Sequence, residues 1–389
     1  MNAKYSQYTP DYFIARAQEL TGLDDFGDKG FIPSYEKYIF SLREEANLTD
    51  EGWRVMETRL TRLLANRLRF AADLKKHPEI LDEKLLPALV IVGLPRTGST
   101  KLQRMVAASK TFQELIMWQG YNPAPWPGSD CSDNDVRIAD AEKFCHWRAT
   151  TSPGTNAAHH VAARQIEEEL YLLEFSFDNA FPNSSAKLPS YHAFLKSRDK
   201  APMYSWLRMM LQYIQWQFHR GDLKPWILKT PNNLGYEGHI LREIPGSKFL
   251  VSHRDPHTLI ASLAALIRAN FTLYSDQVDR EYIGQWVLDE FSSEINRHMA
   301  WRDTNPDVPV LNLAYKDIEA NGLDVARRVH DFLELPFSAE AEKSVQAWLD
   351  TNVQHMHGKH EYSLDEFGLT SADIEKHFGA YMEKYAEYL

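Results

Sequence analysis

The stretch that decides the fold expected for this chain is LPALVIVGLPRTGST, residues 86–100. Its first half, Leu86 to Val92, is a nearly unbroken apolar run rich in valine and isoleucine, which is typical of a strand buried on both faces. Gly93 and Pro95 end that run, and apolar residues at helical spacing follow them. The stretch therefore predicts a strand, a tight turn and a helix, in that order.

The same order of strand, turn and helix recurs three times toward the C-terminus. Strands that alternate with helices imply a parallel sheet with right-handed crossovers, and such an open sheet carries its ligand site at the carboxyl ends of its strands. We therefore expect an α/β fold, a P-loop-like central parallel sheet flanked by helices, with function at the turns after the strands. The further strands are expected at residues 226–228, 248–252 and 308–313.

Residues 1–84 are predicted to form an added N-terminal helical subdomain, and residues 85–389 the α/β domain. Apolar residues recur at helical spacing within 12–20, 35–42 and 49–74, with Thr49 placed to begin the last helix. A helical excursion, residues 112–220, interrupts the α/β domain. Within it we expect a loop at 120–134 and helices at 135–148, 160–175 and 202–219. The aromatic and methionine residues of the last helix are expected in the core, with an acceptor pocket as the alternative.

Composition excludes several classes of protein. The 389 residues include 43 Lys+Arg and 54 Asp+Glu, and the net charge of −11 disfavours nucleic acid as a partner. The longest apolar run, residues 85–94, is about half of what a bilayer needs, so no integral membrane segment is expected. Two cysteines, Cys131 and Cys145, are too few for a disulfide scaffold or a zinc site. We therefore expect a reducing, cytoplasmic location.

The turn from Gly93 to Thr100 predicts an anion site. Its backbone N–H groups point inward, and the helix that follows adds about half a positive charge. Gly93 and Gly98 have the spacing of a Walker A loop, yet Ser99 stands where such a loop has its lysine. The cation lies within the turn as Arg96 instead. A guanidinium with neighbouring hydroxyls suits one phosphate group better than a triphosphate.

A second anion signal lies after the strand expected at 248–252. Arg254 is expected to close this strand, and Pro256 to begin a helix that carries Ser262 in its second turn. An arginine and a hydroxyl at this spacing can hold a separate phosphate, although an arginine that ends a strand is more often a salt-bridge partner. The weight of the signal comes from its co-occurrence with the first turn.

Together, the sequence PRTGST at 95–100 and Arg254 with Ser262 resemble the two phosphate motifs of sulfotransferases that use 3′-phosphoadenosine 5′-phosphosulfate (PAPS). The chain is similar to the bacterial branch of this family related to tyrosylprotein sulfotransferases, from about residue 88 to 380. The blocks at 226–236 and 360–369 also resemble family blocks. The resemblance implies metal-independent, in-line transfer of a sulfuryl group from PAPS to a hydroxyl of a small molecule, lipid or glycan.

The resemblance also implies roles for individual residues. The 5′-phosphosulfate is expected to bind Arg96, Thr97, Gly98, Ser99 and Thr100, and the 3′-phosphate Arg254 and Ser262. Lys229, at the end of a neighbouring strand, is expected near the bridging oxygen, where it would stabilise or protonate the leaving group. A solvated loop lysine is the alternative. Lys359 and His360 are expected to fold over the nucleotide, with a solvated basic loop as the alternative.

The acceptor base is not set by the motifs. Some relatives place a glutamate about twenty residues after the phosphate loop, whereas this chain has Gln119, whose amide cannot accept a proton at neutral pH. We expect His160, supported by Glu168, to act as the base, because imidazole titrates near neutral pH. His159 is the alternative histidine. The run of glutamates at 167–169 remains open as a solvated helix face.

Two other functions stay open. A nucleotide kinase of the P-loop class would require Mg²⁺ and a loop lysine. A non-catalytic protein that binds nucleotides such as 3′-phosphoadenosine 5′-phosphate (PAP) would account for Gln119. The sequence contains no heptad seam, and it specifies neither the oligomeric state nor the acceptor.

Overall fold

The computed structural model describes residues 5–152, 154, 156, 159–352 and 363–389. The chain folds into two compact units, each assembled from three segments. Unit 1 consists of Met1–Lys84, Ile116–Asp222 and Ala269–Val278, and unit 2 of Leu85–Leu115, Leu223–Arg268 and Asp279–Leu389. Within the described residues, no helix combines the length and apolar character that crossing a membrane requires.

Unit 2 is built on a four-stranded sheet in the order β2-β1-β3-β4, in which all neighbouring strands are parallel. The strands are β1 (Leu89–Val92), β2 (Ile227–Lys229), β3 (Lys248–His253) and β4 (Val310–Ala314). Val90 at the centre of β1 pairs with Leu228 and Phe249, and all four residues of β1 are buried. The predicted parallel sheet and its doubly buried first strand are confirmed.

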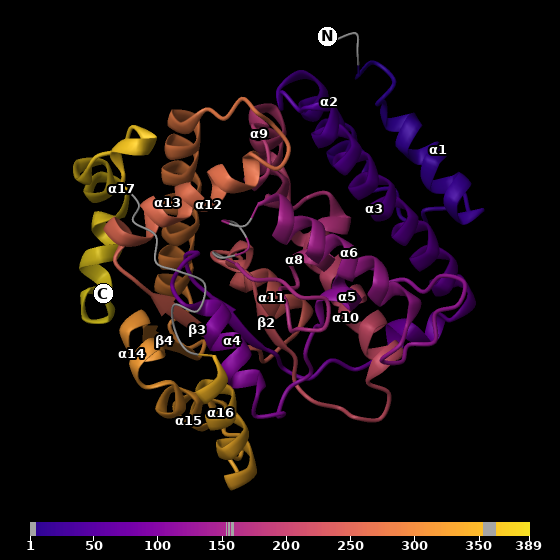
Figure 1. The fold of residues 1–389 in the computed structure, drawn as a ribbon. Helices are drawn as coiled ribbons and strands as arrows, with labels where there is room; N and C mark the ends of the chain where they lie inside the picture. Colours follow the sequence, from indigo (N-terminus) through magenta and orange to yellow (C-terminus); the bar gives the residue numbers. More distant parts are fainter. Residues whose placement is uncertain (1–4, 153, 155, 157–158, 353–362) are drawn as a thin grey trace. The chain divides into compact units, whose positions relative to one another are not determined.

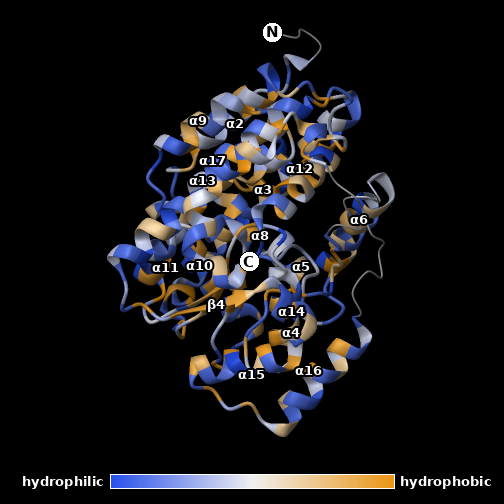
Figure 2. Cartoon of the chain, turned by 90° about the vertical axis from the view of Figure 1, so that its left-hand side faces the viewer, coloured by the Kyte–Doolittle hydropathy of each residue, from blue (hydrophilic) through white to orange (hydrophobic). Residues whose placement is uncertain are grey.

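Helices follow each strand of unit 2, as the alternating pattern predicts (Figure 1). The helices α15 and α16 pack against α4 and against each other, and Figure 2 shows apolar and polar residues interleaved along both of them. The helices that begin in this unit are α4 (Ser99–Ala107), α11 (Glu237–Glu243), α12 (Pro256–Phe271), α13 (Arg280–Thr304), α14 (Tyr315–Ala320), α15 (Gly322–Leu333), α16 (Ala339–Thr351) and α17 (Ser371–Lys384). Short 3₁₀ helices lie at Pro231–Asn233, Asp365–Phe367 and Ala386–Tyr388.

Unit 1 is helical, and its α1 lies along α3 while α2 packs against α9 (Figure 1). Thr49 caps α3 by accepting a hydrogen bond of 3.0 Å from the Gly52 N–H, as the predicted helix start requires. The helices are α1 (Pro10–Thr21), α2 (Ile32–Glu44), α3 (Asp50–Lys76), α5 (Met117–Tyr121), α6 (Val136–Thr151), α8 (Leu170–Leu173), α9 (Pro189–Ser197) and α10 (Ala201–Phe218). Met203, Trp206 and Met210 of α10 are buried, so the prediction that this stripe is core is confirmed.

The helix predicted at 160–175 is wrong. Only α8 and a 3₁₀ turn at Glu174–Ser176 form there, and neither His159 nor His160 begins a helix. The preceding chain pairs with another backbone segment instead, because Met117 donates to the Gln165 carbonyl and Ile116 forms an antiparallel bridge with Ile166. The run Glu167–Glu169 is therefore no solvated helix face, and its side chains are 2 %, 9 % and 1 % exposed.

Candidate active site

The turn after β1 begins with Gly93, whose backbone conformation is one that only glycine adopts readily. Gly93 has φ 139°, and a Cβ there would lie 2.7 Å from the Ser252 carbonyl oxygen of β3. Gly98, which precedes α4, has φ 82°, and its Cβ would meet the Tyr315 ring at 3.0 Å. Because both positions are crowded and left-handed, the two glycines are required by the path of the turn. The turn delivers the N-terminus of α4 to the carboxyl end of the sheet.

Arg96 also adopts a left-handed backbone, with φ 71°. This conformation is uncommon for a residue other than glycine, and it is held by a hydrogen bond from the residue that follows β3 and by one to α12. The Arg254 guanidinium donates to the Arg96 carbonyl at 2.9 Å, and Arg96 Nε donates to Ser262 Oγ at 3.2 Å. The two arginines that the sequence places far apart therefore meet at one edge of the sheet, together with Ser262.

The hydroxyls of the turn are fixed by neighbouring strands. Thr97 is fully buried, donates to the Leu94 carbonyl at 2.7 Å and lies 2.6 Å from Ser252 Oγ. Lys229 ends β2, is 1 % exposed, and donates from Nζ to Thr100 Oγ1 at 3.1 Å. Lys229 is therefore buried beside the turn, and the alternative of a solvated loop lysine is wrong.

Lys101, the lysine displaced from the Walker position, is directed away from the turn. Its Nζ forms an ion pair of 2.9 Å with the Glu319 carboxylate and a hydrogen bond of 3.3 Å with the Glu319 carbonyl on α14. This placement agrees with the loop chemistry expected from the sequence, in which Arg96 supplies the cation.

His253, the last residue of β3, directly precedes Arg254 and anchors the end of the strand. It is fully buried, with Nδ1 3.0 Å from the Tyr381 hydroxyl and Nε2 2.9 Å from Asn312 Oδ1. Burial lowers the pKa of His253 to about 4, so the ring is neutral at physiological pH. The rings of Tyr381, Tyr385 and Tyr388 stack on it, with centroids 5.8, 4.4 and 5.2 Å away.

The Arg254 guanidinium itself lies over the Tyr315 ring, 4.2 Å from its centroid. Stacking and the hydrogen bond to the Arg96 carbonyl fix its plane from two directions. Ser252, His253 and Tyr315 of this edge are not predicted from the sequence. For the first two a signal exists, because they lie directly before Arg254 in the same motif, whereas Tyr315 is placed by the fold of β4 and α14. Lys359 and His360 lie outside the described residues.

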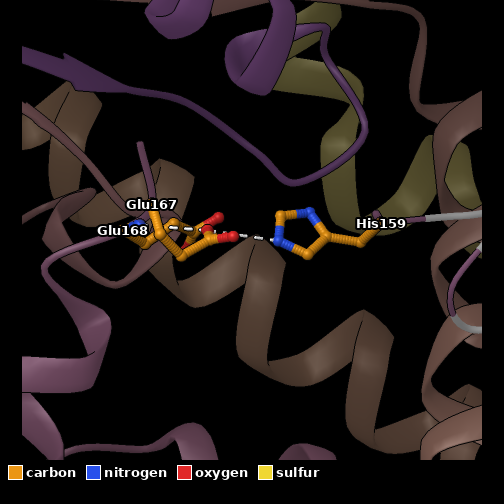
Figure 3. Close-up of side chains that lie close together, drawn as sticks. All are labelled: His159, Glu167 and Glu168. Atoms are coloured by element: carbon orange, nitrogen blue, oxygen red, sulfur yellow. Dashed lines mark hydrogen bonds and ion pairs between the residues drawn. The ribbon is translucent and has the colours of Figure 1, made fainter. Parts of the chain in front are cut away.

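Unit 1 contains a separate cluster of a histidine and two buried carboxylates (Figure 3). His159 Nε2 lies 3.3 Å from Glu167 Oε1, and the same oxygen accepts a 3.0 Å hydrogen bond from the Glu168 N–H. Arg148 of α6 donates to the His159 carbonyl at 2.7 Å and so holds this segment in place. The structure therefore joins His159 with Glu167, whereas the sequence-based prediction pairs His160 with Glu168.

The same cluster has the donor set of a cation site. One ligand atom from each of His159, Glu167 and Glu168 lies within 4.8 Å of the others. Imidazole and carboxylate groups can hold a divalent cation, and equally a carboxylate can orient an imidazole for proton transfer. The geometry permits both kinds of chemistry.

Gln119, at the position of the family glutamate, has a structural role. Its side-chain Oε1 accepts a 3.1 Å hydrogen bond from the Ile116 N–H and so caps the first turn of α5. The side chain is 7 % exposed. Gln119 therefore fixes the start of a helix, which agrees with its lack of a proton-accepting group.

These features define an α/β protein in which a glycine-containing turn, two arginines and a buried lysine lie at the carboxyl edge of a parallel sheet. A model of the sulfotransferase family matches residues 87–339, which is more than half of the chain. The chain belongs to the sulfotransferase family.

Two solved structures share the whole fold. The crystal structure of sulfotransferase STF1 from Mycobacterium tuberculosis H37Rv has a TM-score of 0.82 and 26 % identity, covering 96 % of this chain and 98 % of that one. Sulfotransferase STF9 from Mycobacterium avium has a TM-score of 0.86 and 23 % identity, with 97 % of each chain covered. A search of curated proteins finds no match.

Proposed function

We propose that this chain transfers a sulfuryl group from PAPS to a hydroxyl group of a small molecule, lipid or glycan, by in-line displacement and without a metal ion. The observation that supports this proposal most strongly is the meeting of Arg96, Arg254 and Lys229 at one edge of the sheet. Three cations at the carboxyl ends of three strands suit a ligand with several separate anionic groups. A single inorganic anion would need fewer.

The residues of this edge fit PAPS. The crowded positions of Gly93 and Gly98 bring backbone N–H groups and the start of α4 to the turn, which is where a phosphate is best bound. Arg96 with Thr97, Gly98, Ser99 and Thr100 would hold the 5′-phosphosulfate, and Arg254 with Ser262 the 3′-phosphate. When bound, PAPS supplies the sulfuryl group and leaves as PAP.

Arg96 and Lys229 would act on the charge that develops during transfer. A fixed guanidinium and a buried ammonium stabilise negative charge on a leaving phosphate without reorganisation, and one such contact is worth about 3 kcal/mol. The Thr100 hydroxyl orients the Lys229 ammonium at 3.1 Å. From that position the ammonium would stabilise the bridging oxygen or give it a proton.

The base is proposed to come from the cluster in unit 1. A base must take the proton of the acceptor hydroxyl, and a histidine oriented by a carboxylate is suited to this at neutral pH. Glu167 contacts His159 at Nε2, so His159 Nδ1 is the nitrogen that would accept the proton, and Glu167 would stabilise the imidazolium. His160 with Glu168 remains the second assignment, and the two are separated by mutation.

The decisive experiment is calorimetric titration of PAP into the full chain in the presence of EDTA. We expect binding without Mg²⁺, weakened at least tenfold in Arg254→Gln, because a charged hydrogen-bonding partner is lost. Lys101→Gln is the matched control, since Lys101 pairs with Glu319 outside the turn. Binding of ATP that requires Mg²⁺, with no binding of PAP, would contradict the proposal and favour a kinase.

Catalysis is tested by transfer of labelled sulfate from PAPS to pooled hydroxyl-bearing metabolites. Transfer that is unchanged by EDTA, and is lost in Arg96→Ala, supports the proposal. Tight PAP binding with no transfer to any acceptor class would identify a non-catalytic nucleotide-binding protein. Transfer that is abolished by EDTA and restored by a divalent cation would assign a metal to His159, Glu167 and Glu168.

A further inference from the structure

A cavity of about 790 Å³ opens in unit 1 along one face of α3. The α3 residues that line it recur every three or four positions from Arg54 to Arg69, so they form a single stripe of about 22 Å along the helix. Arg16 and Leu20 of α1, with Trp126 from the loop after α5, line the other sides. The cavity is far larger than an inorganic ion, so it suits an organic molecule.

Most charges in this cavity are balanced by neighbours. Arg16 pairs with Glu19 at 2.9 Å and lies 3.9 Å from Glu57, and Arg54 pairs with Glu51. Asp140 accepts a 2.9 Å hydrogen bond from the Asn122 amide. These groups therefore have partners within the protein.

Arg62 is also accounted for by its surroundings. It is 8 % exposed, donates to the Tyr121 carbonyl and pairs with Glu174 at 3.3 Å. Its guanidinium lies 4.0 Å from the centroid of the Tyr121 ring. Arg62 therefore lines the cavity with its charge already paired.

Arg69 differs from the other arginines of the cavity. Among the residues that the structure describes, no carboxylate pairs with it, and its guanidinium lies 5.4 Å from the centroid of the Trp126 ring. The side chain is half-buried, and this burial lowers the pKa of Arg69. A guanidinium withdrawn from water in this way is stabilised by an anionic partner, which the described protein does not supply.

The rest of the stripe offers hydroxyl groups to a ligand. Thr58 and Thr61 lie on the same face of α3 and line the cavity, and the Thr58 hydroxyl donates to the Arg54 carbonyl, which leaves its oxygen able to accept. Hydroxyls and a carboxylate along one wall with an indole on another are suited to a ligand rich in hydroxyl groups. The anionic and the hydroxyl-binding features lie in one cavity.

We infer that this cavity is a second binding site of the chain, for a hydroxyl-rich organic monoester of phosphate or sulfate whose oxyanion pairs with Arg69. The planar fork of the guanidinium matches two oxyanion oxygens at once, and the Trp126 ring lies beside it. The site is built within unit 1 alone. It does not depend on the proposed sulfuryl transfer.

The test is calorimetric titration of the full chain with inorganic phosphate, glucose 6-phosphate, glucose 6-sulfate and glucose. We expect the two sugar esters to bind more tightly than phosphate, and glucose not to bind. Arg69→Gln should weaken the esters at least tenfold. Lys76→Gln is the matched control, because it removes the same charge from an exposed position of the same helix. Equal affinities in wild type and Arg69→Gln for every probe, or no binding of any probe, would overturn the inference.

Two further variants keep the result interpretable. Arg254→Gln should retain the Arg69-dependent binding, so that failure of the proposed donor site and failure of this site are distinguished. Arg69→Gln should unfold, without ligand, at the wild-type temperature or above it, because it removes a half-buried charge that lacks a carboxylate. Arg69→Lys should recover part of the affinity. A lower unfolding temperature together with unchanged ester binding would show that Arg69 is a packing residue and not a ligand-binding one.

Discussion

The sheet edge of unit 2 and the histidine–glutamate cluster of unit 1 are constructed in contrasting ways. At the edge, cations lie at the carboxyl ends of three parallel strands, where Arg254 donates to the Arg96 carbonyl and Lys229 to the Thr100 hydroxyl. In the cluster, His159 is brought to Glu167 by irregular chain, and a single bond of 3.3 Å joins their side chains. The residues of the edge are thus positioned by the strands of one sheet, whereas those of the cluster are positioned by irregular chain and its backbone hydrogen bonds.

The largest effect expected at the sheet edge comes from Lys229→Met. Removing a buried ammonium beside the turn should lower the rate of sulfuryl transfer about 10²–10³-fold, because charge on the leaving group loses a fixed partner. Lys101→Met is the matched control and should change the rate little, since its ammonium pairs with Glu319. Rates of labelled-sulfate transfer provide the measurement. Equal losses in both variants would remove Lys229 from the mechanism.

Burial of His253 before Arg254 makes the free energy of unfolding depend on pH. The folded chain holds His253 neutral down to a pKa of about 4, whereas the unfolded chain takes up this proton near its ordinary value of 6.5. Acid therefore favours the unfolded chain, and stability should fall by up to about 3 kcal/mol between about pH 6.5 and pH 4. Urea unfolding across this range measures the loss.

The controls for this experiment are two single substitutions. His253→Gln should flatten the dependence of unfolding free energy on pH, although it lowers stability at neutral pH. His146→Gln, at an exposed position of α6, should keep the wild-type dependence. A wild-type profile in the His253 variant would mean that other groups dominate acid unfolding and that the His253 ring is not held neutral in the folded chain.

In the cluster of unit 1, His159→Gln should reduce transfer about a hundredfold, within the range for loss of a general base. The residual rate should rise with pH as hydroxide replaces the lost base. His160→Gln is the neighbouring comparison and should have a smaller effect, because it is His159 that contacts Glu167. The reverse order would restore the assignment of His160 with Glu168.

The smallest effect concerns the turn itself. Gly93→Ala should lower the free energy of unfolding by about 2 kcal/mol, because φ is 139° and the added Cβ would meet the Ser252 carbonyl. Gly379→Ala, in α17 with nothing within 4 Å of the new Cβ, should raise stability by up to about 1 kcal/mol. Chemical denaturation measures both. An unchanged free energy of unfolding in Gly93→Ala would show that the turn can rearrange to accept a Cβ.

The sheet edge could be predicted from the sequence because each of its parts is a local signal. A run such as that ending at Val92 reads as a buried strand, and parallel strands bring their following turns together wherever they lie in the chain. This reasoning predicts that Arg96 and Arg254 meet, and the family resemblance adds Lys229. Tyr315 could not be predicted, because no local pattern indicates that the start of α14 lies beside Gly98.

The cluster could be predicted only in part, because it depends on a non-local pairing. Residues 163–166 bond to the backbone at 116–118, and that pairing prevents the helix that the apolar spacing favours. With a helix assumed, His160 and Glu168 lie two turns apart on one face. In the extended chain the side chains that meet are those of His159 and Glu167.

The tyrosines that enclose His253 have a consequence for engineering. Tyr381 belongs to α17 and forms a hydrogen bond with His253, the residue before Arg254. A shift of α17 would therefore also move the chain at Arg254. Chimeras that exchange C-terminal segments between relatives in order to alter acceptor preference should therefore also shift nucleotide affinity, unless Asn312 and the three tyrosines are transplanted together.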